Sequence, residues 1–375
     1  MENKAFTRSL FIKLLWFILF VSLLIACSPT TSIKIGFVTD LSSRNSALGI
    51  QARNGLNMAI DEINSKGGIH GRNFEAIIGN HKGEPEICTV VVKDLIDRGS
   101  HLIIGPMVSG MASTVISVAE ESGTLVIGPT VSTDTLTGID DNFLRIVATA
   151  STQGKSLASF VLSMDNKNIV LILNKTNIAY TQAVSEGFHN ELKNTDFQIA
   201  PDIYFESKDE FPQIVEKLEI IKPDAIVFSA TGIDTAGIIQ LYAKNNEIPQ
   251  LLGSSWVKVT NVIDYGGKTV EGMIIIDSFE NLEPIKREIE FTNKFKDLYS
   301  AEPNIAARSV YETVYLYAEA FRISKNLKSS EIKKTILEME IIEGLDSEFR
   351  LDEYGDGVRK LSFFVVKDGK YKLMP

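Results

Sequence analysis

Short apolar runs alternate with longer amphipathic stretches along this chain from residue 33 onwards. The first run, residues 33–38, predicts a buried strand. In the next stretch apolar residues recur every three or four positions up to Ile63, which predicts a helix closed by Gly67-Gly68. The same alternation predicts three more strands and two more helices: strands 74–78, 101–105 and 125–128, and helices 90–96 and 111–121.

A second series repeats the pattern further along the chain. Its predicted strands are 169–173, 199–205, 225–229, 251–252 and 272–276, and its predicted helices are 183–192, 211–221 and 235–245. Helices at 284–299, 306–324 and 329–339 follow, and then alternating strands over residues 348–373. Repeated strand–helix alternation is typical of parallel sheets covered on both faces by helices. The fold class is therefore α/β, with two doubly wound parallel-sheet lobes.

The first 28 residues have a different pattern. A basic lead with Lys4, Arg8 and Lys13 precedes an apolar run over residues 14–26, which is broken only by Ser22. A spanning helix needs about 20 apolar residues, so this run is short for an anchor and typical of a secretory signal. The closing residues Leu24-Ile25-Ala26-Cys27 resemble a bacterial lipobox, which implies removal of residues 1–26 and lipidation of Cys27. A plain membrane anchor with an incidental cysteine is the alternative.

Length and charge narrow the class of protein. About 350 residues follow Cys27, more than the ~250–300 at which single cores stop growing, so two domains are expected. The formal net charge is -10 without a basic stripe, which argues against nucleic acid as a partner.

Metal and cofactor chemistry have no support in the sequence. With Cys27 lipidated, Cys88 is a lone thiol on an apolar helical pattern, where it is expected to be a small buried hydrophobe. The histidines are scattered without ligand spacing. No nucleotide-binding glycine motif follows the first strand, and no G-x-S-x-G elbow surrounds a serine. We therefore expect no metal, no cofactor and no enzymatic activity, although distant residues could still assemble a catalytic triad.

Candidate binding residues follow the predicted strands. The strand at 101–105 leads into Gly105-Pro106-Met107-Val108-Ser109, and the strand at 125–128 leads into Gly128-Pro129-Thr130-Val131-Ser132. Ligands bind outside the carboxyl ends of parallel strands, and hydroxyls beside helix starts suit a carboxylate. On the residues alone two interpretations stay open, because Ser109 and Ser132 could equally be ordinary helix caps.

Several stretches together resemble the type I periplasmic binding proteins, in particular the branched-chain amino acid (Leu/Ile/Val) binding proteins of ABC transporters. The likeness runs from residue 33 nearly to the end of the chain. The matching stretches are Ile35-Gly36-Phe37-Val38-Thr39-Asp40-Leu41-Ser42, Ala59-Ile60-Asp61-Glu62-Ile63-Asn64, Gly67-Gly68-Ile69-His70-Gly71-Arg72, Ile104-Gly105-Pro106-Met107-Val108-Ser109-Gly110, Gly128-Pro129-Thr130-Val131-Ser132, Tyr180 with Gly187-Phe188, Pro223-Asp224-Ala225-Ile226-Val227-Phe228 and Tyr311-Glu312-Thr313-Val314.

The resemblance implies two lobes that are joined by three crossings and close over a ligand. We expect the crossings near residues 148–152, 277–280 and 344–349. The expected parts of the chain are a signal peptide at 1–26, a lipidated tether at 27–32, an N-terminal lobe at 33–149 plus 279–345, and a C-terminal lobe at 150–278 plus 346–375.

The resemblance also implies roles for individual residues. Ser109 would bind the carboxylate of the ligand. Thr130 would offer its backbone carbonyl, and Ser132 its hydroxyl and amide. Tyr180 would close over the ligand from the second lobe.

Two positions depart from the family pattern. Ser254-Ser255-Trp256 stands where an amino-acid binder often has an acid for the ligand ammonium, and Thr231-Gly232 stands where a second tyrosine is common. A buried ammonium without a carboxylate partner is costly. Either Asp234 or Asp277 serves instead, or the ligand is not a simple α-amino acid. Trp256 either stacks on the ligand or packs between the lobes.

The leading hypothesis for function is an exported lipoprotein that captures a small amino acid, amide or carboxylate. It would deliver this ligand to an ABC permease of the inner membrane while its lipid anchor holds it at a membrane, in the periplasm or at the cell surface. A ligand sensor of the same fold, which presents its closed form to a signalling receptor, is the first alternative. An exported hydrolase is the second.

Overall fold

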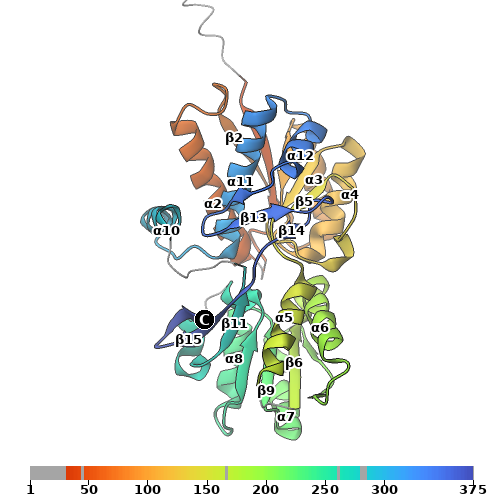
Figure 1. The fold of residues 1–375 in the computed structure, drawn as a ribbon, viewed down its shortest axis with the longest axis vertical. Coiled ribbons are helices and arrows are strands. Elements are labelled where there is room, and N and C mark those ends of the chain that lie inside the picture. Colours follow the sequence, from red (N-terminus) through yellow and green to blue (C-terminus); the bar gives the residue numbers. More distant parts are fainter. Residues whose placement is uncertain (1–30, 44–45, 165–167, 260–261, 279–284, 375) are drawn as a thin grey trace, which may run out of the picture.

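The structure is a computed structural model that describes residues 31–43, 46–164, 168–259, 262–278 and 285–374. Cys27, the expected signal peptide and most of the expected tether lie outside these residues. Within the described part of the chain, no helix is long and apolar enough to cross a membrane. Two lobes lie one above the other, and the N-terminal and C-terminal parts of the chain mix in the upper one (Figure 1).

The first lobe is built on a parallel sheet of five strands in the order β2-β1-β3-β4-β5. Every residue of β3 and β4 is buried, as expected for central strands covered on both faces. The strands are β1 (Ile33–Thr39), β2 (Phe74–Asn80), β3 (Leu102–Ile104), β4 (Leu125–Gly128) and β5 (Phe143–Arg145).

Helices cover both faces of this sheet. One apolar core joins β1 to the helices α2 (Ser46–Ser65), α10 (Lys286–Tyr299), α11 (Ile305–Ser324) and α12 (Ser329–Leu337). A second core on the opposite face contains buried residues of α3 (Pro85–Asp97) and α4 (Ala112–Ser122), among them Cys88. Burial raises the pKa of the Cys88 thiol to about 12, as expected for a small buried hydrophobe.

The second lobe has a mixed sheet in the order β16-β15-β11-β10-β9-β6-β7, with β8 also paired to β6. The pairs from β7 to β11 are parallel, whereas β15 and β16 add an antiparallel edge. The strands are β6 (Asn168–Asn174), β7 (Gln198–Ile199), β8 (Ile203–Phe205), β9 (Ala225–Ser229), β10 (Gln250–Gly253), β11 (Ile274–Asp277), β15 (Ser362–Lys367) and β16 (Lys370–Leu373).

Helices cover this sheet on both faces as well. α5 (Ala150–Leu162) and α6 (Ile178–Leu192) share one core, while α7 (Phe211–Ile221) and α8 (Gly232–Tyr242) share the other; the short α9 (Val262–Gly266) follows β10. The 3₁₀ turns are η1 (Ser109–Met111), η2 (Asp134–Leu136), η3 (Lys175–Asn177), η4 (Lys208–Glu210), η5 (Ser255–Lys258) and η6 (Gly267–Val270). The predicted fold class, two doubly wound α/β lobes, is confirmed.

The three passages between the lobes differ in part from the expected ones. The first runs from β5 to α5 through Val147, and the expected second passage at 277–280 lies only partly within the described residues. The expected third passage at 344–349 instead lies in the first lobe, since Leu345 and Phe349 belong to its core. There β12 (Ile342–Glu343), β13 (Glu348–Leu351) and β14 (Gly357–Val358) form a small antiparallel sheet. The chain therefore returns to the second lobe only after β14.

Candidate functional site

The two glycine–proline loops lie side by side at the carboxyl ends of adjacent strands, β3 and β4. Their side chains also join them. The backbone N–H of Ser132 donates to the Ser109 hydroxyl oxygen at 3.1 Å, and the Thr130 hydroxyl donates to the Met107 carbonyl at 2.7 Å. These bonds join the two loops at the edge of the first lobe. We call the three hydroxyl residues there, Ser109, Thr130 and Ser132, the hydroxyl ledge.

The second lobe faces this ledge with an aromatic and amide cluster. The Tyr180 hydroxyl donates to the Gln153 side-chain oxygen at 2.9 Å and lies 3.3 Å from the Ser255 hydroxyl. Burial raises the pKa of the Tyr180 hydroxyl above its usual value, so this group stays protonated and remains a donor. The ring of Trp256 meets the ring of Tyr180 edge to face at 5.8 Å, which fixes both rings.

Ledge and cluster enclose the candidate site, which we call the cleft. Its polar side chains are Thr130, Ser132, Gln153, Asn177, Ser255 and Ser278, and its aromatic ones are Tyr180 and Trp256. Its apolar side chains are Leu48, Met107, Val147, Val259 and Ile305. All of these described lining groups are uncharged at neutral pH. This lining combines a few hydrogen-bonding groups with apolar and aromatic surface, as is usual for small-molecule sites.

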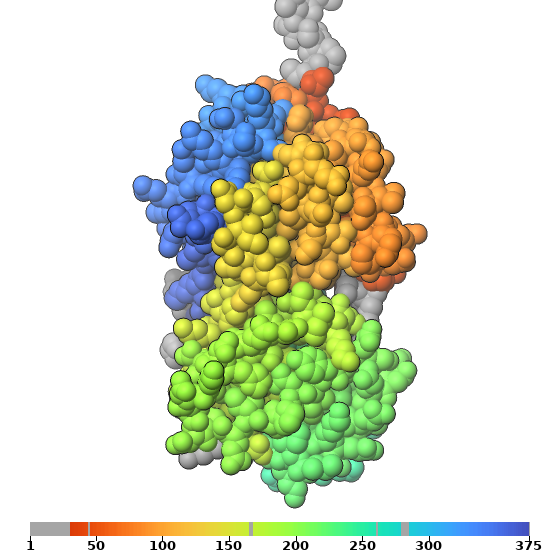
Figure 2. Space-filling model, turned by 90° about the vertical axis from the view of Figure 1, so that its right-hand side faces the viewer, coloured from red at the N-terminus to blue at the C-terminus, as the bar shows by residue number. Residues whose placement is uncertain are grey.

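Direct bonds cross from one lobe to the other around the cleft. The Gly110 N–H in η1 donates to the Asn177 side-chain oxygen at 3.2 Å, and the Ala150 N–H at the start of α5 donates to the Ser132 carbonyl at 2.7 Å. Figure 2 shows the two lobes in contact at a narrowed waist. The structure therefore holds the lobes close together, with the ledge and the cluster on opposite sides of a small opening.

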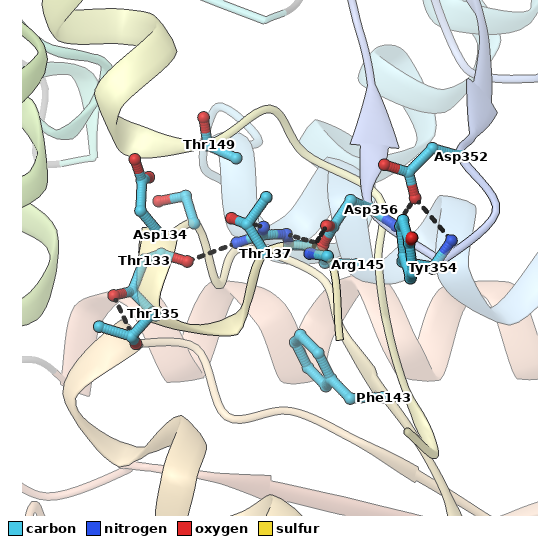
Figure 3. Close-up of polar contacts among 12 residues, drawn as sticks. Thr133, Asp134, Thr135, Thr137, Phe143, Arg145, Thr149, Asp352, Tyr354 and Asp356 are labelled. Carbon is cyan, nitrogen blue, oxygen red and sulfur yellow. Dashed lines mark hydrogen bonds and ion pairs between the residues drawn. The ribbon is translucent and has the colours of Figure 1, made fainter. Parts of the chain in front are cut away.

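A buried arginine holds the loop that follows the hydroxyl ledge. Arg145, at the end of β5, is fully buried. It donates from Nε to Asp356 at 2.7 Å, from Nη1 to the Thr133 carbonyl at 2.6 Å, and from Nη2 to the Thr137 hydroxyl at 2.6 Å. Figure 3 shows Arg145 between the loop that carries Thr133 and Thr137 and the turn that carries Asp356. Arg145, at the start of the first passage between the lobes, is thus bonded to the turn with Asp356, which precedes the third passage, and to the loop that follows Ser132.

The two acids considered for a ligand ammonium are engaged elsewhere. Asp234 is buried at the start of α8, where its carboxylate accepts hydrogen bonds from Asn174 and from the Thr231 hydroxyl, each at 2.8 Å. Asp277 forms an ion pair with Lys258 and accepts from the Ser278 N–H at 2.7 Å. It lines a larger neighbouring cavity of about 890 Å³ instead of the cleft.

Four of the six ligand-binding residues expected from the sequence line the cleft: Thr130, Ser132, Tyr180 and Trp256. Ser109 does not line the cleft, but its hydroxyl accepts from the backbone N–H of Ser132. Asp234 lies in the first turn of α8, where its N–H donates to the capping residue Thr231, and it does not line the cleft. Gln153 and Asn177 also line the cleft and were not predicted. Gln153 lies in the first turn of a helix that was not predicted, and Asn177 lies in a 3₁₀ turn whose only signal is the polar run after β6.

The sequence and the fold of this chain are similar to those of known proteins. The model of a family described as "Periplasmic binding protein" matches residues 32–370. A Leu/Ile/Val-binding protein, BraC3 of Rhizobium johnstonii, is 29% identical over 220 residues, which cover 58% of this chain and 59% of that protein. The chain thus spans less than two thirds of this relative's length in the match.

Solved structures extend the similarity of the fold. The branched-chain amino acid binding protein LivJ of Streptococcus pneumoniae, in complex with isoleucine, has a TM-score of 0.82 at 22% identity and covers 92% of this chain and 99% of its own. A solute binding protein of R. palustris in complex with benzoate also has a TM-score of 0.82, at 18% identity, with 92% and 95% covered.

Proposed function

Because the chain belongs to the periplasmic binding protein family, we propose that it captures a small solute between its two lobes and delivers it to an ABC permease. Members of this family are solute-binding proteins and not enzymes, so the expectation that the chain is not an enzyme is confirmed. No chemistry is needed for this task. Closure is a shift between open and closed lobes that a ligand drives by touching both lobes at once.

The observation that carries the proposal is the pairing of a hydroxyl ledge with an aromatic cluster across one cleft. Ser132 and Thr130 come from the first lobe, and Tyr180 and Trp256 come from the second. A ligand whose carboxylate is hydrogen-bonded to the Ser132 hydroxyl would place its apolar part against the two aromatic rings. Such a ligand gains both sets of contacts only when the lobes are together, which is the differential affinity that closure requires.

Ligand binding can be tested by thermal unfolding of the full-length chain purified in mild detergent. The solutes are branched and aromatic amino acids, the matching carboxylic acids and amides, with sugars as unrelated controls. A ligand at a hundredfold excess over its Kd stabilises the native state by about 2.7 kcal/mol. For a protein of this size the expected rise in Tm is about 2–4 °C. No shift with any amino acid, carboxylate or amide would contradict the proposal.

We also propose that the protein is a lipoprotein anchored through Cys27. Periplasmic binding proteins are exported, which supports treating the basic and apolar N-terminus as a signal. Replacing Cys27 by serine should abolish incorporation of labelled fatty acid into the protein. Cys88→Ser is the matched control and should leave labelling unchanged, since Cys88 is buried in the first lobe. A labelled Cys27→Ser protein would contradict the anchor.

A further inference from the structure

The hydrogen bonds that the polar side chains of the cleft already make determine whether these side chains can donate to a ligand or accept from it. Gln153 accepts two hydrogen bonds on its side-chain oxygen, from the Tyr180 hydroxyl at 2.9 Å and from the Ser255 backbone N–H at 3.2 Å. A backbone N–H can only donate, so the atom that receives it must be the amide oxygen. This bond fixes the orientation of the amide, and the end of Gln153 that is left for a ligand is its NH₂ donor.

Asn177 is fixed in the same way. Its side-chain oxygen accepts the backbone N–H of Gly110 across the two lobes at 3.2 Å. Its NH₂ group is therefore also the end that remains for a ligand. Both amide side chains that line the cleft, one from α5 and one from η3, thus have their oxygens in use and can offer a ligand only NH₂ donors.

An ammonium group is a poor match for two amide side chains that can only donate. It carries three donors and no acceptor, so it needs oxygen atoms and a negative charge close by. The described lining of the cleft contains no carboxylate, and Asp234 and Asp277 are held by Asn174, Thr231 and Lys258. A buried charge without a partner is strongly unfavourable.

We propose that the cleft selects small apolar or aromatic carboxylic acids in which a neutral acceptor, such as a hydroxyl or keto oxygen, replaces the α-ammonium of an amino acid. This inference rests on the proposed solute-binding function and names its substrate class. The carboxylate accepts a hydrogen bond from the Ser132 hydroxyl, since the Thr130 hydroxyl already donates to the Met107 carbonyl. The acceptor oxygen takes the amide donors of Gln153 and Asn177, and the apolar body lies against Trp256.

Ligands with one skeleton test this preference. The dissociation constants of leucine, 2-hydroxy-4-methylpentanoate, 4-methyl-2-oxopentanoate and 4-methylpentanoate are measured by calorimetry on the full-length chain, together with phenylalanine and 3-phenyllactate. We expect the hydroxy or keto acid of a series to bind at least ~10-fold tighter than its amino acid. Tighter binding of leucine or phenylalanine would overturn the inference and leave the solute-binding function intact. No binding of any of these acids or amino acids would also overturn the inference, and the wider panel of thermal unfolding then decides the solute-binding function.

A charge variant tests the role assigned to Gln153. Gln153→Glu keeps the oxygen that accepts from Tyr180 and Ser255 but replaces the NH₂ donor by a carboxylate oxygen. It should change the ratio of the dissociation constants of leucine and 2-hydroxy-4-methylpentanoate by about tenfold in favour of leucine. Gln213→Glu places the same charge at an exposed position on α7 and should leave the ratio unchanged. An unchanged ratio in a folded Gln153→Glu protein would overturn the assignment. If that variant does not fold, the comparison of ligands on the unaltered chain decides.

Discussion

Replacing Arg145 by methionine is expected to lower the free energy of unfolding by about 3–5 kcal/mol, the usual cost of removing one partner of a buried ion pair. Methionine fills much of the same space but leaves the buried carboxylate of Asp356 without its cation. It also leaves the Thr133 carbonyl and the Thr137 hydroxyl without their donor. Urea unfolding monitored by circular dichroism measures the change.

An exposed arginine provides the control for this variant. Arg98 pairs with Asp94 on the surface of α3, where both side chains are more than half exposed, so Arg98→Met should cost less than about 1 kcal/mol. The double variant Arg145→Met with Asp356→Leu should be more stable than the sum of its single changes predicts, because no charge is then left unpaired. Equal unfolding midpoints for Arg145→Met and Arg98→Met would contradict the role given to the buried pair.

Replacing Ser109 and Ser132 together by alanine is expected to abolish ligand binding while leaving the fold intact. The Ser132 hydroxyl lines the cleft, and the Ser109 hydroxyl holds the backbone of Ser132 in place. Hydrogen bonds to a charged group contribute roughly 1.5–3 kcal/mol each. Losing the Ser132 bond should therefore weaken a carboxylate ligand by about 10- to 100-fold, since each 1.4 kcal/mol is about tenfold. Losing the Ser109 bond that positions Ser132 should weaken it further.

Calorimetry with the tightest acid of the panel measures this loss, and circular dichroism verifies the fold. Ser122→Ala is the matched control in the same lobe. Its hydroxyl bonds to the Ala119 carbonyl and to Thr124 at the end of α4, away from the cleft, so affinity should not change. Affinity within threefold of the unaltered protein in the double variant would show that the hydroxyl ledge does not hold the ligand.

Most elements could be predicted because their apolar spacing is regular. The strand at 225–229 and the helix at 211–221 occur as β9 and α7 with the same bounds. The predicted strand at 199–205 is two short strands, β7 and β8, separated at Pro201, which cannot donate to the ladder. Buried strands with continuous apolar runs and helices with one apolar face leave little ambiguity.

Among the elements that were not predicted, β5 and α5 are created by packing and not by periodicity. β5 has only three residues, and one of them is Arg145, a buried charge that breaks the apolar pattern. α5 is rich in Ser, Thr and Gly, which are poor helix formers. It is stabilised by close contact with α6. Gly154 and Gly187 each lie against the backbone of the other helix, so that a Cβ at either position would collide with a carbonyl oxygen.

The candidate site follows the same division. The two glycine–proline loops could be found because they follow predicted strands, and Tyr180 was assigned through the family resemblance. Trp256 was noted at a position that departs from the family pattern. Gln153 belongs to the unpredicted helix α5. Asp234 was predicted as a ligand-binding residue but lies away from the cleft, and the sequence contains a signal for this position. Thr231 and Asp234 have the spacing of a helix cap, and in the structure they bond to each other at the start of α8.

The way α11 completes the first lobe has a consequence for the order of folding. This helix contributes buried residues such as Ala307, Val314 and Tyr317 to the core that also contains β1 and α2. A growing chain makes the whole parallel part of the second lobe before it makes α11. This face of the first sheet, which α2 covers only in part, therefore stays incomplete until about residue 324 has been synthesised. The N-terminal half cannot reach its native packing early, so its early segments are the ones that a chaperone would have to protect.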